Sequence, residues 1–486
     1  MRRGAQAGAV AGTTTAAAMY LAALVTGIRP LPDLLSEPVL ALMPGPVFGF
    51  LIDRLQHLGK VLEEAGLLLA MIAALAVLGM AYTAVAARRR IPQLGLVAGA
   101  LAWAVTCLVV LPLSGDGWLG LNEGVTTPLV WALLYLIYAV LLEAAATPDP
   151  TSVDMGRRRI PLALAGIGVL VLGVRLVPGW YRTVLGAPEN AVAGPAPELT
   201  PTADFYVVSK NFSDPQVSSA GWNLQVIGQV DSPLRLSYAD LRGLPPHTQF
   251  TTLECVSNNV GGPQISTGQF TGVLLRDLLA MARIRPAAQA LVFRARDGYE
   301  ESIPLSLLAD GLEVLVAYDL NGAPLPSAHG YPARILIPGH YGMKGPKWLD
   351  SIEATPRVLD GYWENQGWNR DAVVKTMSRI DAPEDGAIVR GSTTVAGIAF
   401  AGVRGIQRVE ISTNGGQSWA DAELKPPLSP LTWTLWTYTW SSPPTGQHTL
   451  QVRATDGGGH LQSADGRPSY PDGSSGYHGI RVNVGG

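Results

Sequence analysis

Cysteine and histidine are scarce in this chain of 486 residues, which contains two cysteines and seven histidines. Two cysteines exclude a disulfide framework, and one of them, Cys107, lies in a long apolar run. Positive charge is not in excess either. The formal net charge is −3 at pH 7, so no global basic field favours nucleic acid as a partner. These absences leave Cys255 as a lone thiol in the polar half of the chain.

Long apolar runs are present only in residues 1–180, which are rich in Ala, Leu, Val and Gly. A helix needs roughly 20 apolar residues to cross a bilayer. Five stretches meet this length, near 5–28, 61–87, 91–113, 125–146 and 160–178. A shorter stretch, 38–50, is broken by Pro44, Gly45 and Pro46, and indicates an interfacial or re-entrant turn. We therefore expect residues 1–180 to form a transmembrane domain of about five helices in a lipid bilayer.

Arginine clusters predict the orientation of these spans. They occur at Arg2–Arg3, Arg88–Arg90 and Arg157–Arg159. With five spans and a cytoplasmic N-terminus, all three clusters lie on the cytoplasmic side, and the large C-terminal part lies outside the cytoplasm in a multi-pass cell-membrane protein. Consecutive arginines before an apolar segment at 155–173 also have the layout of a twin-arginine signal. Ordinary positive-inside charge is the alternative explanation.

The apolar half offers little for a bound redox group. A haem held between helices needs two facing imidazoles, and residues 1–180 contain one histidine, His57. Glu63, Glu64 and Glu143 lie near the ends of the expected helices, where charges are usually solvated. The sequence therefore favours a membrane anchor, with any electron-transfer partner external to the chain.

Residues 181–204 are rich in Pro and Ala and predict a linker. Strand and helix patterns alternate after it. Leu224 and Val226 recur with a period of two, residues 272–284 place leucines at helical spacing, and 333–339 indicate a buried strand. This mixture predicts an α+β domain over 205–372.

From 373 to 486 the pattern is that of strands alone. Asn414-Gly415 is a hairpin turn between two strand-like segments. Trp436, Tyr438 and Trp440 lie on one face of the alternating run 431–440, and Leu450 and Val452 face inward in the next run. Several short strands over about 110 residues predict an immunoglobulin-like sandwich.

Cys255 ends a strand-like segment and is followed by the polar, glycine-rich run "CVSNNVGG". A lone cysteine is most often a small buried hydrophobe. A soft thiolate also suits a metal, and this run exposes backbone amides and can approach a bulky ligand closely. One thiolate without a CxxC pair or a nearby histidine cannot form a zinc site. A metal at Cys255 must therefore come within an organic cofactor that supplies the other ligands.

A second cluster lies in residues 320–353, where Arg334 opens the buried strand and a glycine-rich turn follows it. His329, Lys344 and Lys347 flank this strand, so the segment is a candidate cradle for an anion. A solvated basic loop is the alternative. His340 is expected to be structural.

"AHGYPARILIPGHYGMKGPKWLDSIE" together with "LECVSNN" resembles the molybdopterin-binding domain of sulfite-oxidase-type enzymes. The sandwich after it resembles the dimerisation domain of sulfite oxidases and plant assimilatory nitrate reductases. The resemblance covers roughly residues 200–486, and its H-G-x-P-x-R…K-W-L pattern is specific. It implies an oxidoreductase with a molybdenum-molybdopterin cofactor, oxygen-atom transfer, an external electron-transfer partner and a possible homodimer.

The resemblance also assigns roles to single residues. Cys255 is implied to be the one protein ligand to molybdenum, and Arg334 to pair with the cofactor phosphate. Asp297 falls where the family has an acid that contacts the pterin. The full set of implied cofactor contacts is Lys210, Asn211, Asp297, His329, Arg334, Gly345, Pro346 and Lys347.

The sequence departs from the family at the substrate side. Sulfite oxidases place arginines just after the cysteine and in the entry segment, where this chain has Val260 and Gly261, and Ser209 and Lys210. The family's substrate-side tyrosine falls on or near Trp368. A pocket without two guanidiniums should bind sulfite poorly. The favoured prediction is oxygen-atom transfer to or from another substrate. A true sulfite oxidase and a metal-free, membrane-tethered binding module are the alternatives.

Overall fold

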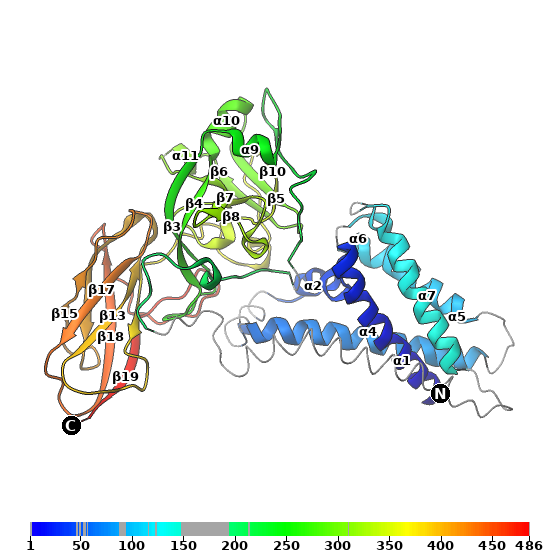
Figure 1. The fold of residues 1–486 in the computed structure, drawn as a ribbon, viewed down its shortest axis with the longest axis horizontal. Coiled ribbons are helices and arrows are strands. Elements are labelled where there is room, and N and C mark those ends of the chain that lie inside the picture. Colours follow the sequence, from blue (N-terminus) through cyan, green and yellow to red (C-terminus); the bar gives the residue numbers. More distant parts are fainter. Residues whose placement is uncertain are drawn as a thin grey trace. The chain divides into compact units, whose positions relative to one another are not determined.

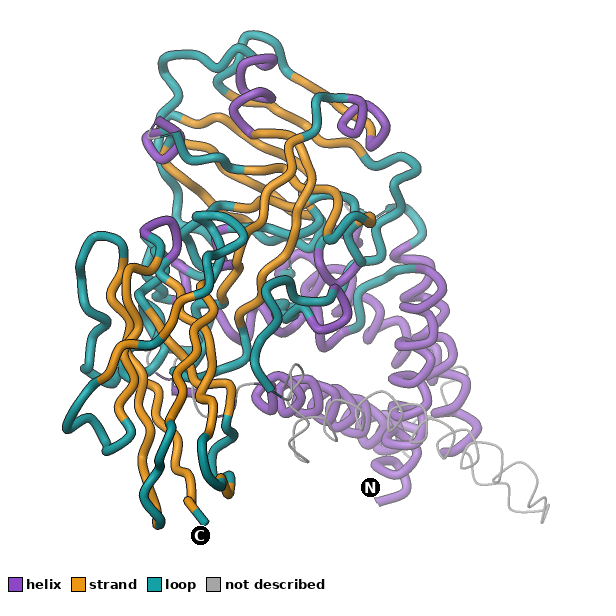
Figure 2. Tube along the Cα trace, turned by 60° about the vertical axis from the view of Figure 1, so that its left-hand side comes forward, coloured by secondary structure: helices purple, strands orange, loops and turns teal. Residues whose placement is uncertain are grey.

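A computed structural model describes residues 2–44, 57–86, 94–114, 116–121, 124–146, 194–211, 214–309 and 311–485, with the single positions 47, 50, 51 and 55. The chain divides into two compact units. The first contains the N-terminal helices, and the second contains nearly all of residues 194–485 and is mostly strands (Figures 1 and 2). The fifth predicted span, the arginine clusters at 88–90 and 157–159, and residues 181–193 of the predicted linker lie outside the described residues.

The N-terminal unit has four helices long and apolar enough to cross a membrane, within the described residues. The candidate spans are Gly4–Thr26, Val61–Ala86, Leu94–Leu113 and Thr127–Ala144, which match the first four predicted stretches. The helices of this unit are α1 (Arg2–Thr26), α2 (Leu31–Ala41), α4 (His57–Ala86), α5 (Leu94–Val105), η1 (Thr106–Val110), α6 (Leu111–Leu113), η2 (Trp118–Gly120) and α7 (Thr127–Ala146). The first residues of the predicted turn at 38–50 are helical, because α2 continues to Ala41 with Pro38 inside it.

Glycines let α1 and α4 approach closely. A Cβ atom at Gly8 would lie 2.7 Å from the Leu75 carbonyl oxygen, and one at Gly79 would lie 2.7 Å from the Gly8 Cα. Small residues at such a crossing permit the backbone contact that drives helix association in lipid. Between the same helices, the Tyr20 hydroxyl donates to Glu64 Oε1 at 2.9 Å. Glu64 is only 5% exposed, so the expectation that it is solvated at a helix end is wrong.

Two sheets build the α+β domain. The first has the order β2-β1-β10-β5-β6, with β1 and β10 parallel. The second has the order β3-β4-β7-β8, and β9 also pairs with β7. The strands are β1 (Asn223–Gly228), β2 (Leu234–Ser237), β3 (His247–Glu254), β4 (Ile265–Leu274), β5 (Ala290–Ala295), β6 (Glu300–Pro304), β7 (Leu315–Leu320), β8 (Ala323–Pro324), β9 (Arg334–Leu336) and β10 (Leu349–Thr355). The helices are α9 (Tyr238–Gly243), α10 (Leu275–Ala282) and α11 (Ser306–Ala309).

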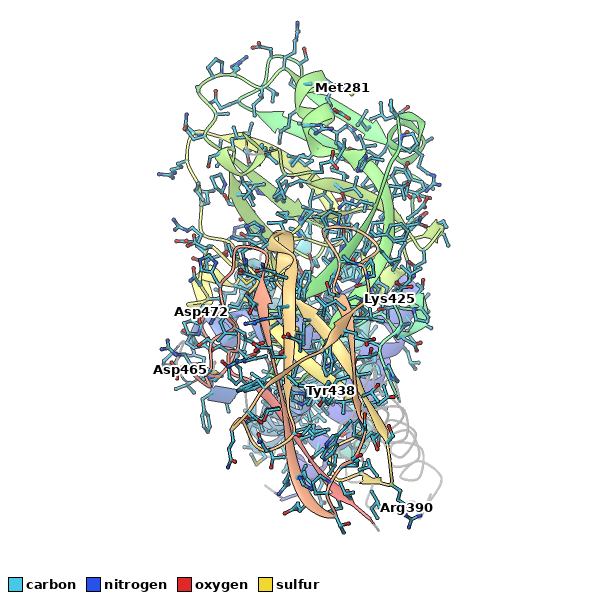
Figure 3. All side chains as sticks on the ribbon, turned by 90° about the vertical axis from the view of Figure 1, so that its left-hand side faces the viewer. Met281, Arg390, Lys425, Tyr438, Asp465 and Asp472 are labelled. Atoms are coloured by element: carbon cyan, nitrogen blue, oxygen red, sulfur yellow. The ribbon has the colours of Figure 1, made fainter. Side chains whose placement is uncertain are left out.

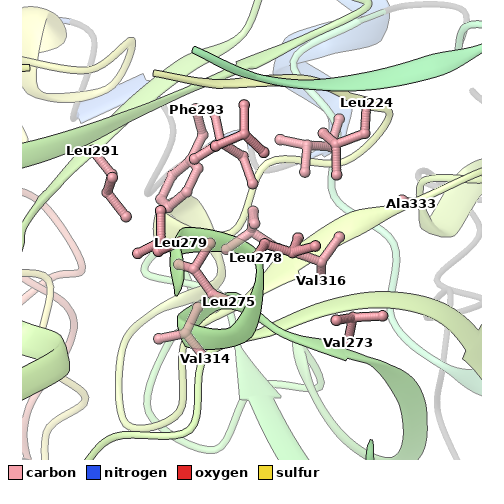
Figure 4. Close-up of a cluster of buried hydrophobic side chains, with 14 of the residues drawn as sticks. Leu224, Val273, Leu275, Leu278, Leu279, Leu291, Phe293, Val314, Val316 and Ala333 are labelled. Carbon is pink, nitrogen blue, oxygen red and sulfur yellow. The ribbon is translucent and has the colours of Figure 1, made fainter. Parts of the chain in front are cut away.

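The core of this domain lies where α10 meets both sheets. Leu275 and Leu278 of α10 are fully buried with Phe293 of β5 and Val316 of β7 (Figure 4). Leu224 from the predicted alternating strand belongs to the same cluster. The predicted helix at 272–284 is shorter than expected, because its first three residues continue β4 and pair with β7.

The C-terminal part is a sandwich of two sheets, as predicted. Their orders are β11-β13-β17-β16 and β12-β19-β18-β14-β15. The strands are β11 (Met377–Ala382), β12 (Ile388–Val389), β13 (Thr393–Phe400), β14 (Ile406–Ser412), β15 (Ala420–Asp421), β16 (Glu423–Leu424), β17 (Thr434–Trp440), β18 (Gly446–Asp456) and β19 (His478–Val484). The predicted hairpin joins β14 to β15, and Trp436, Leu450 and Val452 are buried between the sheets. Tyr438, labelled in Figure 3, is only partly buried.

The described part of the predicted linker, 194–204, lies against both domains. The Thr200 amide donates to the Thr267 carbonyl at 2.8 Å on the α+β domain. The Ala196 amide donates to Asp381 Oδ2 at 3.2 Å on the sandwich. This segment therefore connects the two domains of the second unit.

Candidate cofactor site

Cys255 follows β3 directly and begins a tight turn. Its amide donates to the Gln264 carbonyl, and its carbonyl accepts from the Asn258 amide, both at 3.0 Å. The side chain is 9% exposed and borders an apolar cluster that includes Phe205. Its Sγ lies 3.0 Å from Ser257 Oγ. The thiol is thus held in a fixed position at the end of the strand.

The thiol of Cys255 is protonated near neutral pH when no metal is bound. Burial raises its pKa, and the hydrogen bond with Ser257 and the positive charge of Lys347 only partly oppose this effect. A metal ion must displace the proton to bind the thiolate, so loading of such a site releases a proton. Cys255 and Leu336 of β9 belong to the same buried apolar cluster, so the two sequence-distant motifs lie near each other.

Arg334 begins β9 and is the strongest sign of an anion site. Its side chain is 6% exposed, and Nη1 and Nη2 donate to the carbonyls of His329 and Gly345 at 3.3 and 3.5 Å. Its Nε is buried and has no partner, and no carboxylate pairs with the guanidinium within the described residues. Burial lowers its pKa to about 10, so it stays charged at neutral pH. A buried cation without a protein anion calls for a ligand anion.

His329 is neutral in this environment. Burial, together with the charges of Arg334 and Lys347, lowers the pKa of its imidazole to about 3. Its ring makes an edge-on contact with Phe205, with ring centroids 5.3 Å apart. His329 therefore offers a fixed, uncharged ring beside the Arg334 guanidinium.

The turn after β9 packs back onto the strand. The Ile335 amide donates to the Pro346 carbonyl at 3.0 Å, and a Cβ atom at Gly345 would lie 2.5 Å from the Ile335 carbonyl oxygen. Gly330 has φ of +105°, and a Cβ there would lie 2.9 Å from Lys347 Cβ. Lys347 donates to the Ala328 carbonyl at 2.9 Å. The structure therefore brings together five of the expected residues: His329, Arg334, Gly345, Pro346 and Lys347.

Lys344, the other lysine of this turn, does not belong to the cradle. Its Nζ donates to Glu301 Oε1 at 2.8 Å and to Glu364 Oε1 at 2.5 Å. All three side chains are at most 4% exposed. Burial raises the pKa of Glu301, which also lies close to the second carboxylate. The expectation that both lysines serve an anion is wrong for Lys344, because internal carboxylates already neutralise its charge.

Asp297 and Lys210 lie around a pair of adjoining aromatic rings. Asp297 Oδ1 accepts from the Tyr299 amide at 3.1 Å, and Lys210 Nζ lies 5.2 Å from the Tyr362 ring centroid. The rings of Tyr299 and Tyr362 are 5.6 Å apart. Asn211 is partly exposed and adjoins residues outside the described part of the chain. The roles of these three residues stay predictions.

The sequence did not single out two buried residues of the site. Tyr206 is 9% exposed and belongs to the same apolar cluster as Cys255, and a Cβ atom at Gly342, in the turn after β9, would lie 2.9 Å from its hydroxyl oxygen, so it lies close to both motifs. Glu254 is 5% exposed, and burial raises its pKa to about 7. Its Oε1 accepts from Asn258, whereas Oε2 has no partner. Each stands directly beside a sequence feature that was recognised, but neither has a local pattern of its own.

The fold and this arrangement define the class of protein, an oxidoreductase with a molybdopterin-binding domain. Residues 211–363 match the family model described as oxidoreductase molybdopterin binding domain, and residues 378–452 match the bacterial Ig domain. The crystal structure of the sulfane dehydrogenase SoxCD from Paracoccus pantotrophus has a similar fold, with a TM-score of 0.52. It is 22% identical, and the match covers 60% of this chain and 85% of that chain.

Sequence relatives identify the family within this class. An uncharacterized oxidoreductase, YuiH, from Bacillus subtilis is 34% identical over 149 residues, 30% of this chain and 72% of that protein. Sulfite oxidase from Mus musculus is 31% identical over 297 residues, 50% of this chain and 54% of that protein. The chain thus spans about half the length of the sulfite oxidases it matches. This chain belongs to the sulfite-oxidase-type family of molybdopterin-dependent oxidoreductases, as the sequence motifs predicted.

Proposed function

We propose that the protein is a membrane-anchored oxidoreductase that transfers an oxygen atom at a molybdenum centre bound by Cys255. The observation that carries this proposal is the buried, charged guanidinium of Arg334, whose Nε has no partner. Folding such a group without an anion costs free energy, so its presence is best explained by a ligand phosphate.

The residues of the site fit a molybdopterin. Arg334 and Lys347 would hold its phosphate, with the Gly345-Pro346 turn close enough to the strand to enclose that group. Cys255 would supply the protein thiolate, and no second cysteine is needed because the organic part of the cofactor brings further sulfur ligands. When bound, the cofactor supplies two-electron oxygen-atom exchange with the substrate.

The protein's own residues would orient the cofactor and exclude water. The neutral ring of His329 can contact a polar cofactor group without adding charge, because its pKa is about 3. The apolar cluster around Phe205, Tyr206 and Leu336 closes one side of Cys255. An apolar wall that excludes water lowers the local dielectric constant, and this strengthens the electrostatic contacts made beside it. Lys210, Asn211 and Asp297 remain proposed contacts at the edge of the same site.

The substrate is proposed to differ from sulfite. Relatives of this chain are named sulfite oxidases, but Val260 and Gly261 stand here where that family has an arginine after the cysteine. Neither of these residues has a charged side chain, and Gly261 packs against the His478 ring. Without paired guanidiniums, a small dianion loses its bidentate contacts. Sulfite oxidation remains the second candidate because of the named relatives.

The cellular setting is proposed from the helices and the charge pattern. Four apolar helices are compatible with a membrane anchor, and the arginine clusters favour an extracytoplasmic site for the soluble unit. Electrons would pass to an external cytochrome or a quinone-linked protein. The sandwich is the proposed surface for a homodimer. The suggested twin-arginine export route concerns residues outside the described part of the chain.

The decisive experiment measures molybdenum and pterin per chain after expression in a cofactor-competent host. We expect close to one of each in the wild type. Cys255→Ser should keep part of the pterin and lose turnover, whereas the matched control Cys107→Ser, within the apolar helices, should behave as wild type. Less than about 0.1 molybdenum per wild-type chain would exclude the enzyme and favour a metal-free module. Sulfite-dependent cytochrome c reduction should be weak or absent, and rapid reduction would favour the sulfite oxidase.

A further inference from the structure

The C-terminal sandwich is hydrogen-bonded to the loop 255–262, which begins with Cys255. Ser474 Oγ donates to the Asn258 carbonyl at 2.7 Å, and Arg379 Nη1 donates to the Gly262 carbonyl at 2.8 Å. Both donors belong to the sandwich and both acceptors to the loop 255–262, more than 100 residues away in the sequence. The two bonds attach the loop at its middle and at its end.

A third contact lies between these bonds. Gly261 has φ of +76°, and a Cβ atom there would lie 2.2 Å from His478 Cδ2. The His478 ring is itself fixed, because its Nδ1 accepts from the Ile380 amide at 3.0 Å. The loop backbone therefore lies directly against a ring of the sandwich, and only glycine permits this approach.

The Arg379 side chain is itself fixed by an ion pair within the sandwich. Arg379 Nε lies 2.5 Å from Asp381 Oδ1, and the two side chains are 14% and 7% exposed. The charged donor also makes a stronger bond to a carbonyl than a neutral donor does. Arg379 thus presents its guanidinium to Gly262 in a defined geometry.

The loop transmits this attachment to the thiol through its own bonds. The Asn258 amide donates to the Cys255 carbonyl at 3.0 Å, and Asn258 Oδ1 accepts from the Gln264 amide at 3.0 Å. Asn258 Nδ2 donates to Glu254 Oε1. Asn258, whose carbonyl accepts from Ser474, is therefore also hydrogen-bonded to residues that precede and follow Cys255 in the sequence, Glu254 and Gln264.

We propose that the sandwich sets the position of the Cys255 thiol relative to the rest of the cofactor site, with Arg379 and Ser474 as positioning residues. This inference rests on the proposed function, because the position of the thiol matters only to a metal. The phosphate contacts lie on β9 and its turn, whereas Cys255 follows β3, so one bound cofactor needs both supports at a fixed separation. Groups that orient a metal ligand from outside its coordination sphere affect metal binding strongly.

The contact between the loop 255–262 and the sandwich is polar, and this determines how the test is designed. A small cavity there is lined from both sides by Glu254, Asn259, Tyr341, Lys375, Gln462 and Ser474. Lys375 at this junction is itself paired with Asp472, which is labelled in Figure 3. Water can replace a single lost hydroxyl in such a place. The double variant Arg379→Met/Ser474→Ala is therefore needed beside each single variant.

The first readout uses full-length protein without cofactor. Hydrogen exchange of the amides in 255–264 should accelerate about tenfold or more in the double variant, since two hydrogen bonds, one of them charged, are lost. The control Arg453→Met/Ser418→Ala removes an arginine paired with Glu410 and a hairpin serine, both away from the loop, and should leave 255–264 unchanged. Arg379→Lys should restore most of the protection that Arg379→Met removes.

Two outcomes of this first readout overturn the inference. One is unchanged exchange at 255–264 in the double variant. The other is acceleration spread evenly over both domains, which shows only general loss of stability. Neither outcome depends on molybdenum, so a failure of the proposed function is recognised separately, by the missing metal in the wild type.

The second readout uses loaded protein. At equal molybdenum content, the sulfur-to-molybdenum absorption band should shift in the double variant and not in the control, since the thiolate geometry changes. An identical band in both would overturn the inference.

Discussion

Arg334 Nη1 donates to the backbone carbonyl of His329 at 3.3 Å, and burial lowers the pKa of both side chains but leaves them in different charge states at neutral pH. The imidazole has a pKa of about 3 and is neutral, whereas the guanidinium has a pKa of about 10 and stays charged. Of these two basic groups, the site therefore presents one cation, and no carboxylate in the described part of the chain pairs with it.

Substitution His329→Gln should reduce the acid sensitivity of the cofactor-free protein. The folded pKa of His329, about 3, is below the unfolded value near 6.5, so the unfolded chain binds the proton first as the pH falls. The wild type should lose roughly 1.4 kcal/mol of stability per pH unit below 6.5 relative to the variant. Urea unfolding at pH 7 and pH 5 measures this difference. The exposed His460→Gln serves as control, and parallel pH profiles of wild type and His329→Gln would contradict the expectation.

Substitution Arg334→Met should have opposite effects on folding and on cofactor retention. Replacing a buried cation that lacks a protein anion by an apolar side chain should stabilise the cofactor-free protein by about 1–4 kcal/mol. The same change should lower pterin content at least tenfold, because the phosphate loses its charged contact. Thermal unfolding and pterin analysis of the same preparations test both halves. A destabilised apo variant with full pterin content would exclude the anion site.

Substitution Lys344→Met should destabilise the protein by about 3–5 kcal/mol, because it leaves Glu301 and Glu364 buried without their cation. Glu301→Gln/Glu364→Gln in the same chain should recover much of this loss. The control is Lys425→Met, since Lys425, labelled in Figure 3, pairs with Glu198 at the surface and should cost less than about 1 kcal/mol. Equal losses of stability for Lys344→Met and Lys425→Met, measured by urea unfolding, would contradict the conclusion that Lys344 neutralises buried carboxylates.

Substitution Gly8→Leu should separate α1 from α4 and lower the thermal stability of the detergent-solubilised protein. The Gly8 Cβ position is 2.7 Å from a backbone oxygen of α4, so no side chain fits there. The control Gly66→Leu lies on α4 with nothing within 4 Å of its Cβ position and should be tolerated. Equal stability of the two variants would contradict the packing of these helices.

The features that depend on a local sequence pattern could be predicted from the sequence. The period of two at Leu224 and Val226, the hairpin at Asn414-Gly415 and the motif around Arg334 all appear in the structure as expected. It could not separate Lys344 from Lys347. The two lysines stand three residues apart in one turn, and only the carboxylates of Glu301 and Glu364, distant in sequence, distinguish them.

The features that the sequence did not predict depend on contacts between residues that are distant in the sequence. Residues 272–274 begin the run 272–284, whose leucines have a helical spacing, yet these three residues form strand because β7 pairs with them. The bond between Arg379 and Gly262 joins residues 117 positions apart, and Arg379 lies in no recognisable motif. Such contacts arise from the packing of two domains, and no single-sequence pattern encodes them.

The segment 194–204 and the Arg379 side chain share one carboxylate, that of Asp381. Asp381 accepts from the Ala196 amide through Oδ2 and holds Arg379 through Oδ1. A truncated soluble fragment that starts at Phe205 would remove one partner of this carboxylate. Fragments intended for biochemistry should therefore retain the chain from Gly194 onward, since a shorter start would remove the hydrogen bond that the Ala196 amide donates to the carboxylate holding Arg379.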